Sequence, residues 1–81
     1  MRYATTAHFD RAYKKLPKPI REVFNKQVQL LLDDIRHPSL RAKKYNAAAD
    51  IWQARVTKNV RFYFCIQKDT YVLLNIRKHT D

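Results

Sequence analysis

The stretch that decides the fold spans residues 51–66, IWQARVTKNVRFYFCI, where two strand-like runs flank the polar residues Thr57-Lys58-Asn59. Counting by twos divides each run into an apolar and a more polar set, which is the pattern of a half-buried β-strand. The apolar set comprises Trp52, Ala54, Val56, Val60, Phe62, Phe64 and Ile66. The opposite set includes Arg55 and Arg61. The stretch therefore predicts a hairpin with one apolar face and one basic face.

A third strand-like run follows Lys68-Asp69 and alternates in the same way. Its apolar set is Val72, Leu74 and Ile76, and its opposite set is Tyr71, Leu73, Asn75 and Arg77. Continuing the count places His79 on the side of Arg77. We therefore expect one sheet face to gather four side chains suited to an anion, namely Arg55, Arg61, Arg77 and His79.

The residues before this stretch predict one short strand and two helices. A strand is expected over residues 2–6, followed by a helix from Ala7 to Leu16 with Thr6 as its N-cap. Pro19 suits the first turn of a second, amphipathic helix that ends at His37-Pro38. The order strand, helix, helix, strand, strand, strand predicts an α+β fold, in which a helical hairpin packs on one face of a small antiparallel sheet.

The connections between these elements contain no glycine, because the chain has none. Residues 39–50 are irregular and basic and are predicted to form a loop. In the two hairpin turns, Asn59 and Asp69 are expected to take the left-handed conformation that glycine would otherwise supply.

Length and composition predict one small domain over residues 1–81 with an anionic partner. The formal net charge of +10 opposes compaction and favours binding to nucleic acid, an acidic protein or an anionic membrane. No apolar run reaches the roughly 20 residues that span a bilayer. The N-terminus also lacks an apolar secretion signal. We therefore expect a cytoplasmic protein that does not insert into a membrane.

The basic face suggests a specific chemistry. A guanidinium group can donate to two phosphate oxygens at once and stays charged at any working pH. Arginines therefore suit a phosphodiester and the extra negative charge of its transition state. Histidine adds a proton carrier whose usual pKa lies near neutrality. Because the chain shows neither a metal-ligand cluster nor paired carboxylates, we expect no metal or cofactor and a cleavage that uses the 2′-hydroxyl of RNA. Lys43, Lys44 and Lys58 are expected to contact the RNA backbone.

A simpler interpretation of the same face is a basic RNA-binding surface without catalysis. With 17 Lys and Arg residues in the chain, some arginines align by chance. His79 stands close to the C-terminus, where a solvated side chain is common. Tyr63 and Tyr71 share the parity of the basic face and are the candidates for stacking on bases.

Four segments, in this order, resemble the RelE/ParE superfamily of bacterial toxin-antitoxin toxins. They read Phe9-x-x-Ala12-x-x-x-x-Leu16-Pro17, Ile51-Trp52-x-x-Arg55-Val56, Val60-Arg61-Phe62-x-Phe64 and Leu73-Leu74-x-Ile76-x-x-His79. The resemblance covers nearly the whole chain and implies the fold predicted above. For the RelE-like branch it implies a ribosome-dependent endoribonuclease that cuts mRNA and inhibits translation. It further implies an acidic antitoxin that binds the toxin in a hetero-oligomer.

The resemblance also implies roles for the four residues of the basic face. Arg61 matches the strand arginine that stabilises the phosphate in RelE-like members, and Arg55 matches a basic residue on the preceding strand. Arg77 and His79 match the C-terminal arginine and the histidine of members that use histidine in acid-base chemistry.

The sequence departs from the RelE-like pattern in two places. Where some members place a carboxylate base before the tryptophan strand, this chain offers only Asp50. Many members also carry a tyrosine close to the histidine, whereas His79 is followed by Thr80 and Asp81. The ParE-like branch inhibits DNA gyrase without cutting RNA. A gyrase inhibitor and a catalytically weak RNA-binding domain are therefore the alternatives to an mRNA endonuclease.

Overall fold

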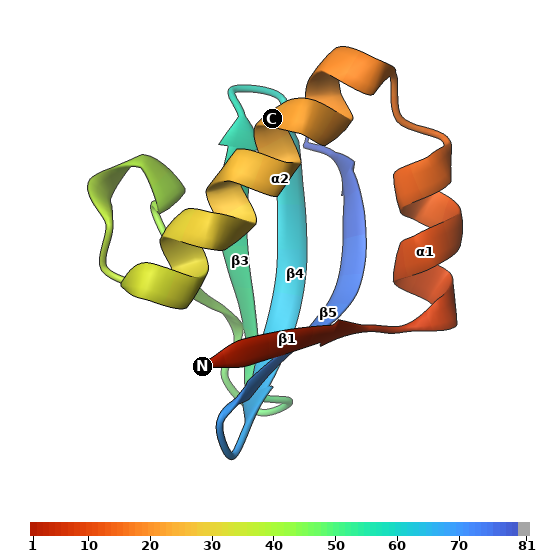
Figure 1. Ribbon diagram of the computed structural model, residues 1–81. Coiled ribbons are helices and arrows are strands. Elements are labelled where there is room, and N and C mark those ends of the chain that lie inside the picture. The colour runs from red at the N-terminus through yellow and green to blue at the C-terminus, as the bar shows by residue number, and fades with distance from the viewer. Residues whose placement is uncertain (80–81) are drawn as a thin grey trace.

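The computed structural model describes residues 1–79 and contains a five-stranded sheet with two helices on one of its faces (Figure 1). In chain order the elements are β1 (Arg2–Thr5), α1 (Ala7–Lys14), α2 (Lys18–Asp33), the short helical turn η1 (Pro38–Leu40), β2 (Lys43–Asn46), β3 (Ile51–Thr57), β4 (Val60–Gln67) and β5 (Thr70–Lys78). The predicted α+β fold is confirmed. The strand order is β1-β5-β4-β3-β2. The prediction of a wholly antiparallel sheet is wrong for β1, which runs parallel to β5 and makes the sheet mixed.

Both helices begin for the reasons that the sequence suggests. The Phe9 N–H donates to Thr6 Oγ1 at 3.1 Å, so Thr6 is the N-cap of α1 as predicted. Pro19 lies in the first turn of α2, where its missing N–H leaves no bond unmade. This helix ends at Asp33, before the predicted end at His37-Pro38, because the backbone of Asp34 is extended. Pro38 then begins the separate turn η1.

The core lies between the helices and the apolar face of the sheet. Phe24 of α2 meets Phe62 of β4 edge to face, with ring centroids 5.2 Å apart. Trp52 stacks on Phe64 across β3 and β4 at 6.2 Å, as their shared parity predicts. Figure 1 shows α2 lying across these two central strands, so the opposite face of the sheet is left without a covering layer.

The first half of β5 has the opposite parity to the one predicted. Ile76 pairs with Phe62, but Leu73 pairs with Phe64, so Leu74 is an extra residue in the strand. This β-bulge turns Tyr71 and Leu73 into the core, where they are 5% and 0% exposed. The predictions that Tyr71 and Leu73 face outwards, and that Val72 and Leu74 face the helices, are wrong. Counting by twos fails wherever a strand contains a bulge.

The loop predicted over residues 39–50 contains the strand β2, which pairs antiparallel with β3. Its residues are all exposed, so this edge strand shows no apolar alternation in the sequence. The left-handed residues are Arg41, Asp50 and Lys68, with φ of 46°, 56° and 56°, and not Asn59 and Asp69. Lys68 is the first residue of the turn between Gln67 and Thr70, the position at which a type II′ turn requires positive φ.

Candidate functional site

Three arginines form a row across the open face of the sheet. Arg61 of β4 pairs directly with Arg55 of β3 on one side and with Arg77 of β5 on the other. Like charges at directly opposite positions destabilise a sheet. Within residues 1–79 the ion pairs are Arg2 with Asp69 and Lys44 with Asp50, so no carboxylate neutralises this arginine row. The strand register thus concentrates positive charge where an anionic ligand would stabilise the fold.

Each arginine of the row is held in a different way. The Arg61 Nη1 donates to the carbonyl oxygens of Thr57 at 2.6 Å and Lys58 at 3.1 Å, which ties its guanidinium to the turn between β3 and β4. Arg77 Nη2 donates to the Tyr45 phenol oxygen at 3.3 Å. The backbone carbonyl of Arg55 accepts a hydrogen bond from Gln27 Nε2 at 2.8 Å.

Arg77 also lies over an aromatic ring. Its guanidinium carbon is 5.0 Å from the centroid of Tyr63, a cation-π contact. Hydrogen bonding to Tyr63, together with the negative charge that this side chain carries when it is ionised, raises the pKa of Arg77 further above its already high usual value. The guanidinium therefore stays charged and is oriented by two tyrosines before any ligand arrives.

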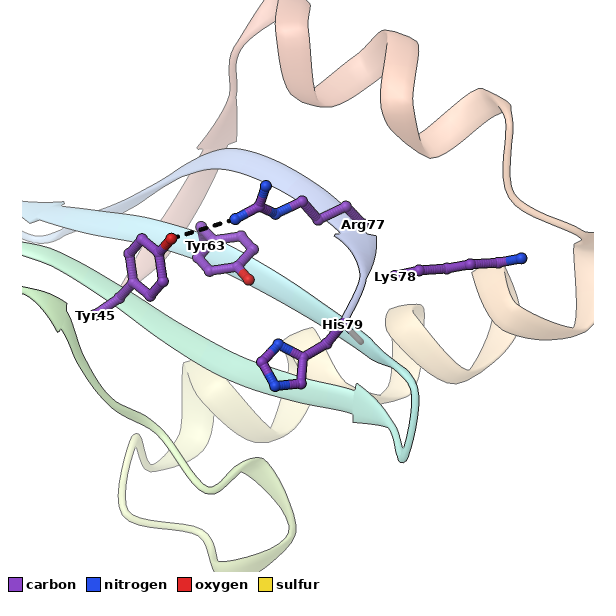
Figure 2. A pocket seen from close by; sticks show the side chains of 5 residues that line it. All are labelled: Tyr45, Tyr63, Arg77, Lys78 and His79. Atoms are coloured by element: carbon purple, nitrogen blue, oxygen red, sulfur yellow. Dashed lines mark hydrogen bonds between the residues drawn. The ribbon is translucent and has the colours of Figure 1, made fainter. Parts of the chain in front are cut away.

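His79 follows the end of β5 and is tied to the sheet by its backbone. The His79 N–H donates to the carbonyl oxygen of Asn59 at 2.6 Å, which fixes the residue beside the turn that Arg61 also contacts. Its side chain is half-buried. Figure 2 shows the imidazole on the same side of the sheet as Arg77, with Lys78 pointing away from it. The backbone hydrogen bond therefore holds His79 at the edge of the open face, on the side of Arg77.

Two hollows meet at His79. One has a volume of about 280 Å³ and is lined by Tyr45, Tyr63, Arg77, Lys78 and His79. The other, also of about 280 Å³, is lined by Arg41, Lys43, Gln53, Arg61 and His79. The structure thus brings the predicted residues Lys43, Arg61, Arg77 and His79 to two hollows that share His79.

The other predicted residues lie at different places. Lys58 is exposed in the turn between β3 and β4, beside the Arg61 guanidinium. Lys44 pairs in register with Trp52, with its ammonium 5.0 Å from the Trp52 ring centroid, and bonds to Asp50. It therefore shares the parity of the helix-covered face. The carboxylate of Asp50 is engaged by that lysine and does not line either hollow.

The structure also adds residues that the sequence pattern did not single out. Tyr45 contacts Arg77 and packs against Tyr63, with ring centroids 4.9 Å apart. Tyr63 faces the open side as predicted but is only 5% exposed, because the side chains of Tyr45 and Arg77 lie against its ring. Gln27 is a buried polar residue within the apolar stripe of α2. A polar residue in that stripe was the feature of the sequence that could have identified it. The predicted stacking role of Tyr71 is wrong because Tyr71 is in the core.

No helix within residues 1–79 is long and apolar enough to cross a membrane. No group of three or more His, Cys, Asp or Glu side chains within the same residues is arranged to hold a metal ion.

Comparison with known proteins gives a likeness of structure rather than of sequence. No protein-family model and no curated protein matches this sequence. Among solved structures, a YoeB/ParE toxin from Agrobacterium tumefaciens matches with a TM-score of 0.80 and 15% identity over 99% of this chain and 100% of that one. The toxin of the archaeal RelE-RelB complex from Pyrococcus horikoshii matches with a TM-score of 0.77 and 16% identity, covering 95% and 92%.

A third structure, a heterotetrameric YoeB-YefM toxin-antitoxin complex from Staphylococcus aureus, contains a chain that matches with a TM-score of 0.78. The identity is 10%, and the match covers 96% of this chain and 95% of that chain. All three likenesses extend over nearly the full length of both chains. They confirm, at the level of the fold, the resemblance to RelE/ParE toxins that the four sequence segments indicate.

Proposed function

We propose that this chain is a member of the RelE/ParE superfamily and the toxin of a toxin-antitoxin pair, acting as a ribosome-dependent endoribonuclease that cleaves mRNA without a metal ion. The observation that carries the proposal is the arginine row with His79 beside it. Three arginines at neighbouring positions of the sheet, without a carboxylate partner in residues 1–79, are unfavourable for folding, and an RNA phosphate offsets that cost.

The proposed reaction is attack of a ribose 2′-oxygen on the adjacent phosphorus. The bond from the 2′-oxygen to phosphorus forms and the bond from phosphorus to the 5′-oxygen breaks, leaving a 2′,3′-cyclic phosphate and a 5′-hydroxyl. The 2′-oxygen loses a proton and the 5′-oxygen gains one. His79 carries out one of these transfers and water the other. Arg61 and Arg77, which line the hollows on either side of His79, stabilise the negative charge on the phosphate oxygens.

The remaining basic residues have supporting roles in this proposal. Arg55, at the end of the arginine row, orients the substrate. Lys43 and Lys58 hold the RNA backbone on the side of Arg61. We assign no RNA contact to Lys44, because its ammonium is paired with Asp50. Lys44 also lies opposite Trp52 and so belongs to the helix-covered face of the sheet.

The proposed partners are the ribosome with its mRNA and an acidic antitoxin. Solved relatives in fold were captured as complexes with RelB or YefM antitoxins. A formal net charge of +10 favours an acidic partner here as well. We propose that the toxin acts in the cytoplasm, where mRNA is translated, and that it is held inactive there in a hetero-oligomer with this antitoxin.

The test is primer extension on an mRNA that is translated in a purified system. The wild-type protein is compared with His79→Ala and with His37→Ala, which replaces the N-cap histidine of η1, a residue that lines neither hollow of the site. We expect ribosome-dependent cleavage by the wild type and by His37→Ala, and at least about 100-fold slower cleavage by His79→Ala. Intact mRNA together with inhibited DNA supercoiling would favour the gyrase inhibitor instead.

A further inference from the structure

A third hollow, of about 200 Å³, adjoins the one that contains His79. It is lined by Tyr45, Ile51, Tyr63, Leu74, Asn75 and Arg77. Three of these, Tyr45, Tyr63 and Arg77, also line the hollow of His79. A ligand group in the third hollow therefore lies next to a phosphate bound by Arg77. Its lining differs from the rest of the open face because aromatic and aliphatic side chains contribute most of it.

Irregularities of the sheet supply this apolar lining. In β2, Lys44 pairs with Trp52 and Asn46 with Ile51, so Tyr45 is the extra residue of a bulge. Bulges commonly redirect a side chain at the edge of a sheet. The bulge in β5 places Leu74 on the open face in the same way. Both departures from regular pairing therefore add an apolar side chain to the same hollow.

Tyr45 is a large aromatic side chain that stays 53% exposed. One part of its ring packs against Tyr63 at an interplanar angle of 66°, and its phenol oxygen accepts from Arg77. In Figure 2 the Tyr45 ring and the Arg77 guanidinium converge above Tyr63. Because the ring is held from two sides, little conformational entropy is lost when a flat ligand stacks on it.

Polar groups stand at the rim of the same hollow. Asn75 Oδ1 accepts from the Ile76 N–H at 2.8 Å, so the amide nitrogen is the donor that Asn75 presents to a ligand. The Arg77 guanidinium has five N–H groups, of which Nη2 bonds Tyr45. The hollow thus combines an aromatic surface, aliphatic walls and hydrogen-bond donors at one edge. That combination fits a planar heteroaromatic ring with acceptor atoms on its rim.

We propose that Tyr45, Tyr63, Asn75 and Arg77 form a subsite for one unpaired nucleobase of single-stranded RNA, adjacent to the phosphate at His79. The subsite rests on the proposed function for its substrate class, and it adds base recognition to a site otherwise described by phosphate contacts. Tyr45 provides the stacking surface, Arg77 bridges the base and the phosphate, and Asn75 donates to an acceptor on the base edge. Stacking of this kind tolerates any base, while the donors favour bases with an acceptor at the rim.

The experiment measures binding of two 2′-O-methyl oligonucleotides of equal length, because 2′-O-methylation prevents cleavage by the proposed route. One carries bases throughout and the other carries abasic residues at the central positions. The proteins are the full chain, Tyr45→Ala, Tyr45→Phe and, as a matched control, Tyr3→Ala, since Tyr3 is an exposed tyrosine of β1 at 42%. Circular dichroism confirms that each variant is folded.

We expect the wild type, Tyr45→Phe and Tyr3→Ala to bind the base-containing oligonucleotide roughly 5- to 150-fold more tightly than the abasic one. In Tyr45→Ala this ratio falls towards one. The proposal is overturned if the wild type does not distinguish the two oligonucleotides, or if Tyr45→Ala keeps the wild-type ratio.

The failure of the subsite and the failure of the proposed function give different results. A base preference that depends on Tyr45, in a protein that leaves translated mRNA intact, supports the subsite and removes the nuclease. Ribosome-dependent cleavage together with a ratio that Tyr45→Ala leaves unchanged supports the nuclease and removes the subsite. The wild-type comparison of the two oligonucleotides stays decisive even if Tyr45→Ala does not fold.

Discussion

The two faces of the sheet use the same three strands for opposite purposes. On the helix-covered face, Phe62 and Phe64 are 0% exposed and belong to the hydrophobic core. On the open face, at the alternate positions of these strands, Arg55, Arg61 and Arg77 stand side by side without a carboxylate partner in residues 1–79. Within one strand, the residues that point to the helices can stabilise the fold while the alternate residues carry charges that repel one another. Substitutions on the two faces should therefore separate stability from activity.

One buried residue links the two faces. Gln27 projects from α2 and donates to the backbone carbonyl of Arg55 at 2.8 Å and to that of Ser39 at 3.3 Å. The carbonyl of Arg55 lies where the register between β3 and β4 shifts. The helix layer thus satisfies a backbone group at the end of the arginine row, and it holds η1 against the same strand.

The largest effect is expected on the covered face. Phe62→Ala should lower the free energy of unfolding by about 3–5 kcal/mol, because it removes a fully buried ring and leaves a cavity. Chemical denaturation measures the loss. Val23→Ala, a partly exposed position on α2, is the control and should change stability by much less. Comparable losses for both variants would contradict a core centred on β4.

A smaller effect is expected at the link between the faces. Gln27→Leu should cost about 1–3 kcal/mol of unfolding free energy, since the part-buried Arg55 carbonyl loses its donor. Gln29→Leu introduces the same residue at an exposed position of the same helix and serves as the control. Denaturant titration compares the two. If Gln27→Leu is as stable as the wild type, the hydrogen bond to Arg55 does not support the sheet.

The arginine row should respond in the opposite direction. Arg55→Gln is expected to raise the free energy of unfolding by about 0.2–1 kcal/mol at low salt, because it removes a like-charge pair with Arg61. The gain should shrink as added salt screens the remaining charges. Thermal unfolding at two salt concentrations measures it, with Arg11→Gln on the exposed face of α1 as the control. A loss of stability in Arg55→Gln would mean that the row is not under electrostatic strain.

The smallest effect concerns alkaline pH. Burial, with a contribution from nearby Asp34, raises the pKa of Tyr71 above its usual value near 10. As the pH rises past about 10, the unfolded chain releases this proton before the folded protein does, so stability falls with pH. Tyr71→Phe should therefore lose less unfolding free energy than the wild type between about pH 9 and pH 11. Curves for Tyr71→Phe and the wild type that fall in parallel would contradict this role of Tyr71.

The sequence predicted the arrangement of helices and strands well, because the periods of α2 and of β3 are regular. It predicted the arginine row because no bulge intervenes between the positions that pair Arg61 with Arg77 and Arg55. It failed for Tyr71 and Leu73, since the extra residue Leu74 in β5 reverses the parity. Such bulges depend on pairing with a second strand, which the alternation within one strand does not report.

The placement of the lysines and of Tyr45 had the same limit. Lys43 and Lys44 read alike in the sequence, but β2 places them at positions of opposite parity, beside Gln53 and Trp52 respectively. Because β2 is an exposed edge strand without apolar alternation, neither its existence nor its two faces could be predicted. The contact of Tyr45 with Arg77 spans 32 residues of chain and likewise depends on the tertiary fold.

The central claim is that RNA cleavage requires the arginine row specifically, and not positive charge in general. The most direct test compares mRNA cleavage in a purified translation system by Arg55→Gln/Arg77→Gln and by Arg11→Gln/Arg36→Gln. Each variant lowers the formal net charge of +10 by two, but only the first alters the row. The account predicts that the row variant folds and no longer cleaves, whereas the control cleaves like the wild type. Equal cleavage by the two variants, whether retained or lost, would contradict it.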